Sequence, residues 1–106
     1  MDSGSSCSES EPFALRVLGD SMLPEFEEGN IVIVDPEGAV HDESYVMAMV
    51  DGEYIFRQLR IVEGKYYLQP LNDLYDTIEI SGFKDIAGVI IQKSIPGKRK
   101  ARIKYS

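Results

Sequence analysis

Short apolar segments separated by turn residues follow one another along most of the chain. Turn residues recur about every eight to twelve positions, and apolar residues alternate with polar ones in several segments, which is typical of β-strands. No segment shows the apolar spacing of an amphipathic helix. We expect strands at 13–18, 31–34, 45–50, 53–59, 66–69, 77–80, 83–92 and 102–105. The pattern therefore predicts a mostly β fold with strongly twisted sheets.

The clearest local prediction is a hairpin centred on Asp51 and Gly52. An Asp-Gly pair between two apolar runs is a favoured two-residue hairpin turn, because such a turn needs positive φ at both positions. On the return strand, alternation places Ile55, Arg57 and Leu59 on one face. An arginine is thereby expected beside two apolar side chains.

Length and composition indicate one folded domain in the cytoplasm. The chain has 106 residues, 43% of them hydrophobic and 27% charged, which suits one compact core. No apolar run reaches the roughly 18 residues of a membrane span, no signal-peptide pattern is visible, and the single Cys7 fits a reducing compartment. We expect a disordered arm at 1–12, a folded domain at 13–95 and a basic tail at 96–106.

The charge distribution argues against direct DNA binding by this domain. The net charge is −7, and five of the eleven basic residues follow Gly97; without those five positive charges, residues 1–97 carry −12. An acidic surface repels phosphate backbones. His41 is the only histidine, and no glycine-rich phosphate loop is present. We therefore expect no metal centre and no cofactor.

A serine, Ser21, stands in a tight turn between the first two expected strands. A Gly-Asp pair that begins at Gly19 precedes it, and a Gly-Asn pair that begins at Gly29 leads into the strand at 31–34. Glycine accepts backbone conformations closed to other residues, so both turns can reverse the chain sharply. Taken alone, such a serine is more often a solvated hydroxyl than a nucleophile.

The stretch 19–36 resembles the serine motif of the LexA-like self-cleaving repressors and UmuD. That motif reads Gly-x-Ser-Met-x-Pro, followed by Gly-Asp and a hydrophobic strand; here Asn30 takes the place of the aspartate. Further segments that resemble family blocks are 32–36, 66–72 and 86–90. The resemblance covers about residues 13–93 and implies twisted β-sheets that form a partly open barrel.

The resemblance also implies site residues. Ser21 would be the nucleophile, and the backbone N–H groups of Ser21 and Met22 would be oxyanion donors. In the family, a strand lysine in a block like Phe-Lys-x-Leu takes the serine proton. The matching block here begins at Phe56 and reads Phe-Arg-Gln-Leu, so Arg57 stands at the position of the general-base lysine. A guanidinium keeps its proton near neutral pH, because its pKa lies above about 12.

The sequence indicates neither a substitute base nor a self-cleavage site. His41, Lys65 and Lys84 fall in expected loops or turns, and nothing in the sequence brings them to Ser21. Family members cut their own chain at Ala-Gly or Cys-Gly, and neither pair precedes Ser21. Either the chain is an excised or already cleaved piece, or it never cleaves itself.

We therefore expect a LexA/UmuD-like peptidase-fold domain of a phage-repressor or SOS-type regulator, with autoproteolysis impaired at Arg57. The resemblance implies a homodimer, with 86–92 and 102–105 as the expected contacts, and a fused or separate DNA-binding domain or a polymerase partner. Two alternatives stay open. One is an active self-cleaving serine peptidase that uses another base, and the other is a small β binding module in which Ser21 is structural.

Overall fold

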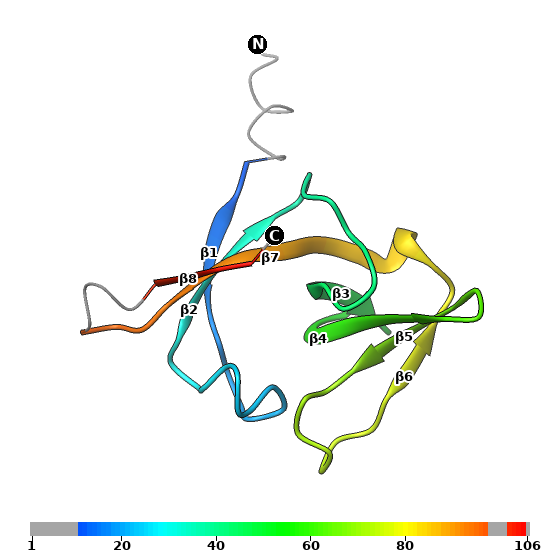
Figure 1. The fold of residues 1–106 in the computed structure, drawn as a ribbon, viewed down its shortest axis with the longest axis horizontal. Coiled ribbons are helices and arrows are strands. Elements are labelled where there is room, and N and C mark those ends of the chain that lie inside the picture. Colours follow the sequence, from blue (N-terminus) through cyan, green and yellow to red (C-terminus); the bar gives the residue numbers. More distant parts are fainter. Residues whose placement is uncertain (1–10, 98–101, 106) are drawn as a thin grey trace.

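The computed structural model describes residues 11–97 and 102–105, and nearly all of their regular structure is β (Figure 1). The strands are β1 (Phe13–Arg16), β2 (Ile31–Asp35), β3 (Tyr45–Val50), β4 (Glu53–Val62), β5 (Lys65–Gln69), β6 (Ile78–Ile80), β7 (Ile86–Ser94) and β8 (Arg102–Lys104). A short 3-10 helix, η1 (Phe83–Asp85), precedes β7. Within these residues, no helix has the length and apolar character needed to cross a membrane.

All eight strands belong to one antiparallel sheet, in the order β1-β2-β7-β3-β4-β5-β6, with β8 added to β7. The long strand β7 pairs with β2 on one side and with β3 and β8 on the other, so it links the two halves of the molecule (Figure 1). The end strands β1 and β6 do not pair with each other, so the sheet stays open. The expected mostly β, partly open fold is confirmed, as one curled sheet.

The strand boundaries follow the sequence pattern closely. Asp51 and Gly52 have φ values of 52° and 83°, which confirms the predicted hairpin turn. At 83–92 the first three residues form η1 instead of strand, and β7 continues to Ser94. Most of the expected arm 1–12 and part of the expected tail 96–106 lie outside the described residues. Residues 102–104 of that tail form β8 and so belong to the sheet.

The core has two apolar clusters, and one of them anchors the loop that carries Ser21. The ring of Phe26, in that loop, is fully buried and lies within 5.4 Å, centroid to centroid, of Tyr45, Phe56 and Tyr105. The second cluster is formed by Val46, Ala48, Leu59, Leu68 and Val89. The Phe26 ring thus packs against side chains of β3 and β4 and against Tyr105. This packing holds the backbone after Ser21 against the sheet.

Candidate functional site

The loop between β1 and β2 holds Ser21 and closes on itself at its base. Val17 N donates to Asn30 O at 2.8 Å, and Gly29 N donates to Val17 O at 2.9 Å. The buried Asn30 side chain accepts the N–H of Glu27 at 3.0 Å through Oδ1. Asn30, where the resemblance leads us to expect aspartate, therefore supplies the side-chain acceptor that closes the loop.

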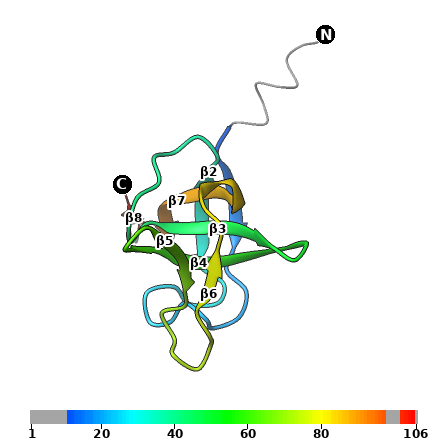
Figure 2. The same cartoon turned by 90° about the vertical axis from the view of Figure 1, so that its right-hand side faces the viewer.

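A second loop, between β5 and β6, lies beside the Ser21 turn at the lower end of both views (Figures 1 and 2). Asn72 N donates to Ser21 O at 2.9 Å, and Asn72 Nδ2 donates to Asp20 O at 3.0 Å. The Tyr75 hydroxyl donates to the Asp20 carboxylate, a hydrogen bond that raises the pKa of Tyr75. These contacts tie the peptide groups around Ser21 to a neighbouring loop.

The side chains of Ser21 and Arg57 meet directly. Arg57 Nη1 donates to Ser21 Oγ at 2.9 Å and to Phe56 O at 2.8 Å. Burial lowers the pKa of Arg57 from its ordinary value, while nearby Tyr75, whose ring centroid lies 5.8 Å from Cζ, acts in the opposite direction. A guanidinium with a lowered pKa is still protonated at neutral pH. The structure thus brings together the two positions expected for nucleophile and base, and places a permanent cation at the second.

A pocket of about 260 Å³ opens beside this pair. Its lining residues are Leu15, Arg16, Val17, Leu18, Ser21, Val32, Met47, Tyr54, Ile55, Phe56 and Arg57. The only charged side chains among them are the two arginines, and no lysine, histidine or carboxylate lines the pocket. Nothing in this lining can accept the serine proton near neutral pH.

Met22 contributes its side chain to the core, where it is 1% exposed. Its N–H and that of Ser21 donate to no acceptor within the described part of the chain. The predicted oxyanion role of these two groups stays a prediction.

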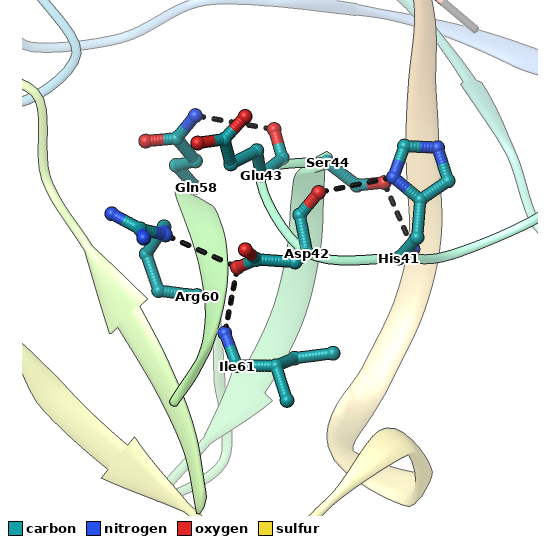
Figure 3. A network of polar contacts seen from close by, with 7 residues as sticks. All are labelled: His41, Asp42, Glu43, Ser44, Gln58, Arg60 and Ile61. Carbon is teal, nitrogen blue, oxygen red and sulfur yellow. Dashed lines mark hydrogen bonds and ion pairs between the residues drawn. The ribbon is translucent and has the colours of Figure 1, made fainter. Parts of the chain in front are cut away.

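The other bases considered from the sequence lie elsewhere. His41 is exposed in the loop before β3, where its N–H donates to Ser44 Oγ at 3.1 Å and its Nδ1 lies 3.0 Å from Asp42 O (Figure 3). Lys65 and Lys84 are also exposed. None of the three lines the pocket at Ser21.

Two charged residues in this structure were missed by the sequence interpretation. Asp42 Oδ1 accepts the N–H of Ile61 at 2.8 Å and Arg60 Nε at 3.1 Å, and these bonds, with that of Ile61 the stronger influence, lower the pKa of Asp42 (Figure 3). Asp42 thereby fastens its loop to β4. No local signal marks this role, because the partners lie 18 and 19 positions away in the sequence.

The second is Lys93, which is only 6% exposed near the end of β7. Its Nζ donates to Glu25 O and lies 3.5 Å from Glu25 Oε2, with the Phe26 ring centroid 5.3 Å away. A lysine directly after an apolar strand usually has an exposed side chain, so the sequence pattern does not predict that Lys93 is buried. Lys93 is a support of the Ser21 loop, since its partner Glu25 belongs to that loop.

The described residues contain no group of three or more His, Cys, Asp or Glu side chains that could hold a metal ion.

Comparison with known proteins identifies the family. The profile of the Peptidase S24-like family matches residues 2–91. The chain is 42% identical over 90 residues to the HTH-type transcriptional regulator for conjugative element R391 of Providencia rettgeri, covering 78% of this chain and 42% of that protein. It is 38% identical over 95 residues to repressor protein C2 of Salmonella phage P22, covering 84% and 44%.

A LexA repressor, from Frankia casuarinae, is 38% identical over 77 residues, covering 72% of this chain and 27% of the repressor. The chain thus spans less than half the length of these relatives. The expected resemblance to LexA-like proteins is confirmed, and this chain belongs to the Peptidase S24-like family, as LexA and phage-repressor relatives and the matched profile together establish.

Proposed function

We propose that this chain is the peptidase-fold domain of a repressor or SOS-type transcription regulator, in which self-cleavage is impaired. The named relatives are repressors and a transcriptional regulator, and each is more than twice as long as the matched segment. A DNA-binding domain, fused or separate, or a polymerase partner would then act with this domain. Regulators of transcription work in the cytoplasm of bacteria, which is where we place the chain.

One observation carries the proposed impairment: Arg57 Nη1 donates to Ser21 Oγ at 2.9 Å. A hydroxyl becomes a good nucleophile when a base takes its proton, and a lysine can do this when burial lowers its pKa. The guanidinium at position 57 only donates hydrogen bonds. Loss of a general base typically costs about 10²–10⁴-fold in rate, so any residual cleavage should be slow.

Self-association is the second part of the proposed function. β7 lies inside the sheet, with partners on both sides, whereas β8 is short and exposed, and its Ile103 is 41% exposed. Exposed strands of this kind are covered by pairing with another copy in many oligomers. We propose β8 as the part of the expected dimer contact that a second copy would reach.

The cleavage experiment joins an Ala-Gly segment ahead of the domain and incubates the purified chain at alkaline pH. We expect no cleavage in the wild type and cleavage after Arg57→Lys. In the Arg57→Lys background, Ser21→Ala should abolish it again. Cleavage by the wild type that Ser21→Ala stops would instead favour the active self-cleaving peptidase.

Self-association is measured by sedimentation of the purified chain across a concentration series. We expect Ile103→Glu to shift the chain toward monomer, because it places a charge on β8. Leu74→Glu is the matched control, since Leu74 is 86% exposed in the loop between β5 and β6. A wild type that is monomeric at every concentration would contradict the proposed dimer.

A further inference from the structure

Arg57 is a half-buried cation whose hydrogen-bonding capacity is only partly used. Its hydrogen bonds come from Nη1 alone, and its Nε is buried with no acceptor among the described residues. The ion pairs among the described residues join Arg60 to Asp42 and Lys93 to Glu25. Neither pair involves Arg57. A partly desolvated charge without a counterion destabilises the folded chain. An anion bound beside Arg57 would reduce that destabilisation.

The pocket beside Arg57 favours an anion by its charge. The whole chain carries −7, yet the pocket is lined by two arginines and no carboxylate. The Asp20 carboxylate accepts the Tyr75 hydroxyl and does not line the pocket. The rest of the lining is mainly apolar, so the anion that fits should carry an apolar group with it.

A second hollow of about 470 Å³ extends this surface. It is lined by Phe13, Leu15, Pro36, Met47, Tyr54 and Ala87. Leu15, Met47 and Tyr54 line both hollows, so the two adjoin along an apolar wall. Tyr54 is 62% exposed, so this wall is open to a ligand longer than one residue.

We propose that the Ser21–Arg57 site binds the free C-terminal carboxylate of a peptide whose last residue is apolar. This rests on the proposed absence of a base at position 57. Arginine donors and a hydroxyl are well suited to a carboxylate, and guanidinium–carboxylate hydrogen bonds are among the stronger ones in proteins. The last side chain enters the 260 Å³ pocket and the preceding residues follow the wall of Leu15, Met47 and Tyr54.

A monoanion matches the site better than an internal peptide bond. An internal peptide group presents a neutral carbonyl, which would leave the charge of Arg57 uncompensated. A terminal carboxylate supplies one negative charge and two acceptor oxygens. The site therefore holds a peptide end without cutting a peptide bond.

The test compares N-acetyl-Ala-Ala-Leu with its C-terminal amide, titrated into the wild-type chain and followed by amide NMR shifts. We expect the acid to bind roughly tenfold or more tightly than the amide. N-acetyl-Ala-Glu-amide should bind like the neutral amide. The proposal would be overturned if the acid and the amide bind equally, or if the acid does not bind up to millimolar concentration. It would also be overturned if the glutamate peptide binds as tightly as the acid.

Two variants assign the effect to Arg57. Arg57→Gln should remove the preference for the acid, whereas Arg60→Gln should keep it, since Arg60 lies on the same strand but pairs with Asp42 outside the pocket. Unchanged selectivity in Arg57→Gln would also overturn the assignment. If Arg57→Gln does not fold, the acid and amide comparison in the wild type decides alone.

The peptide-binding test and the cleavage test can fail independently of each other. Hydrolysis of the Ala-Gly segment by the wild type would contradict the impaired cleavage, whatever the peptides do. Absence of both hydrolysis and carboxylate selectivity would overturn only the binding proposal.

Discussion

The hydroxyl of Tyr105 donates to a carboxylate oxygen of Glu25, which joins the last described residue of the chain to the loop that carries Ser21. Tyr105 N also donates to Ile91 O at 2.9 Å. Lys93 reaches the same carboxylate from β7. Tyr105 is therefore one of the residues that hold the Ser21 loop on the sheet.

Tyr105→Phe should lower the free energy of unfolding by about 1 kcal/mol at neutral pH, because it removes one hydrogen bond to a charged group at a half-buried position. Urea denaturation measures this. Tyr54→Phe is the control, since Tyr54 is 62% exposed and its hydroxyl has no partner among the described residues. Equal midpoints for Tyr105→Phe and the wild type would show that the contact contributes nothing.

The same substitution has an expected pH dependence. Burial, with Glu25 as the second cause, raises the pKa of Tyr105 in the folded chain. The stability linked to a neutral Tyr105 is therefore full below the unfolded pKa of about 10 and is lost as pH rises above it. The difference between wild type and Tyr105→Phe should shrink above about pH 10.

Asn72→Ala should loosen the Ser21 turn. It removes the hydrogen bond from Asn72 Nδ2 to Asp20 O and the bond that Asn72 Oδ1 accepts from Leu74 N. We expect a loss of about 1 kcal/mol in unfolding free energy and faster amide exchange at Leu23. Asp73→Ala, in the same exposed loop, should change neither. Unaltered exchange at Leu23 would show that Asn72 is not a support of the turn.

Much of the fold was predictable because it depends on local signals. Gly19 and Gly29 have φ values of 78° and 97°, which explains why glycine occupies both predicted turns. β3 has the predicted bounds. Strand order was not predictable, because β7 pairs with β2 and β3, which are distant in the sequence, and alternation does not specify neighbours.

The candidate site was predictable only where a motif marks it. Ser21 and Arg57 were predicted as site residues from matching sequence blocks. In the structure, Arg57 Nη1 lies 2.9 Å from Ser21 Oγ. Tyr75 and Lys93 carry no such mark, and the family block at 66–72 that contains Asn72 does not indicate its partners. Each of them acts through a partner far away in the chain, so their roles follow from tertiary packing alone.

The Asp42 carboxylate should make stability fall in acid. Hydrogen bonds from Ile61 N and Arg60 lower its pKa in the folded chain. Its contribution is therefore full above the unfolded pKa of about 3.9 and is lost as pH falls through the lower folded value. Urea midpoints from pH 6 to pH 2.5 should converge between wild type and Asp42→Asn. A constant gap across that range would contradict a contribution from the charged form of Asp42.

Gly88 on β7 has no room for a side chain. A Cβ there would lie 2.5 Å from Val34 Cγ1 and 3.3 Å from Asp35 O. Gly88→Ala should therefore destabilise the chain by about 1–3 kcal/mol, the usual cost of overpacking a core. Val34 is fully buried, so Val34→Ala alone should also cost about 1–3 kcal/mol.

The double variant tests whether the clash with Val34 is the cause. Val34→Ala removes the Cγ1 atom that the new Cβ would meet, so Gly88→Ala should cost less in that background, by about 0.5–3 kcal/mol. Val32→Ala is the matched control: Val32 is 2% exposed on the same strand, and it is not among the atoms nearest to Gly88. Urea unfolding of the four chains in each cycle gives the coupling. Additive costs in the Val34 cycle would assign the strain to the backbone of Asp35, which neither valine substitution relieves.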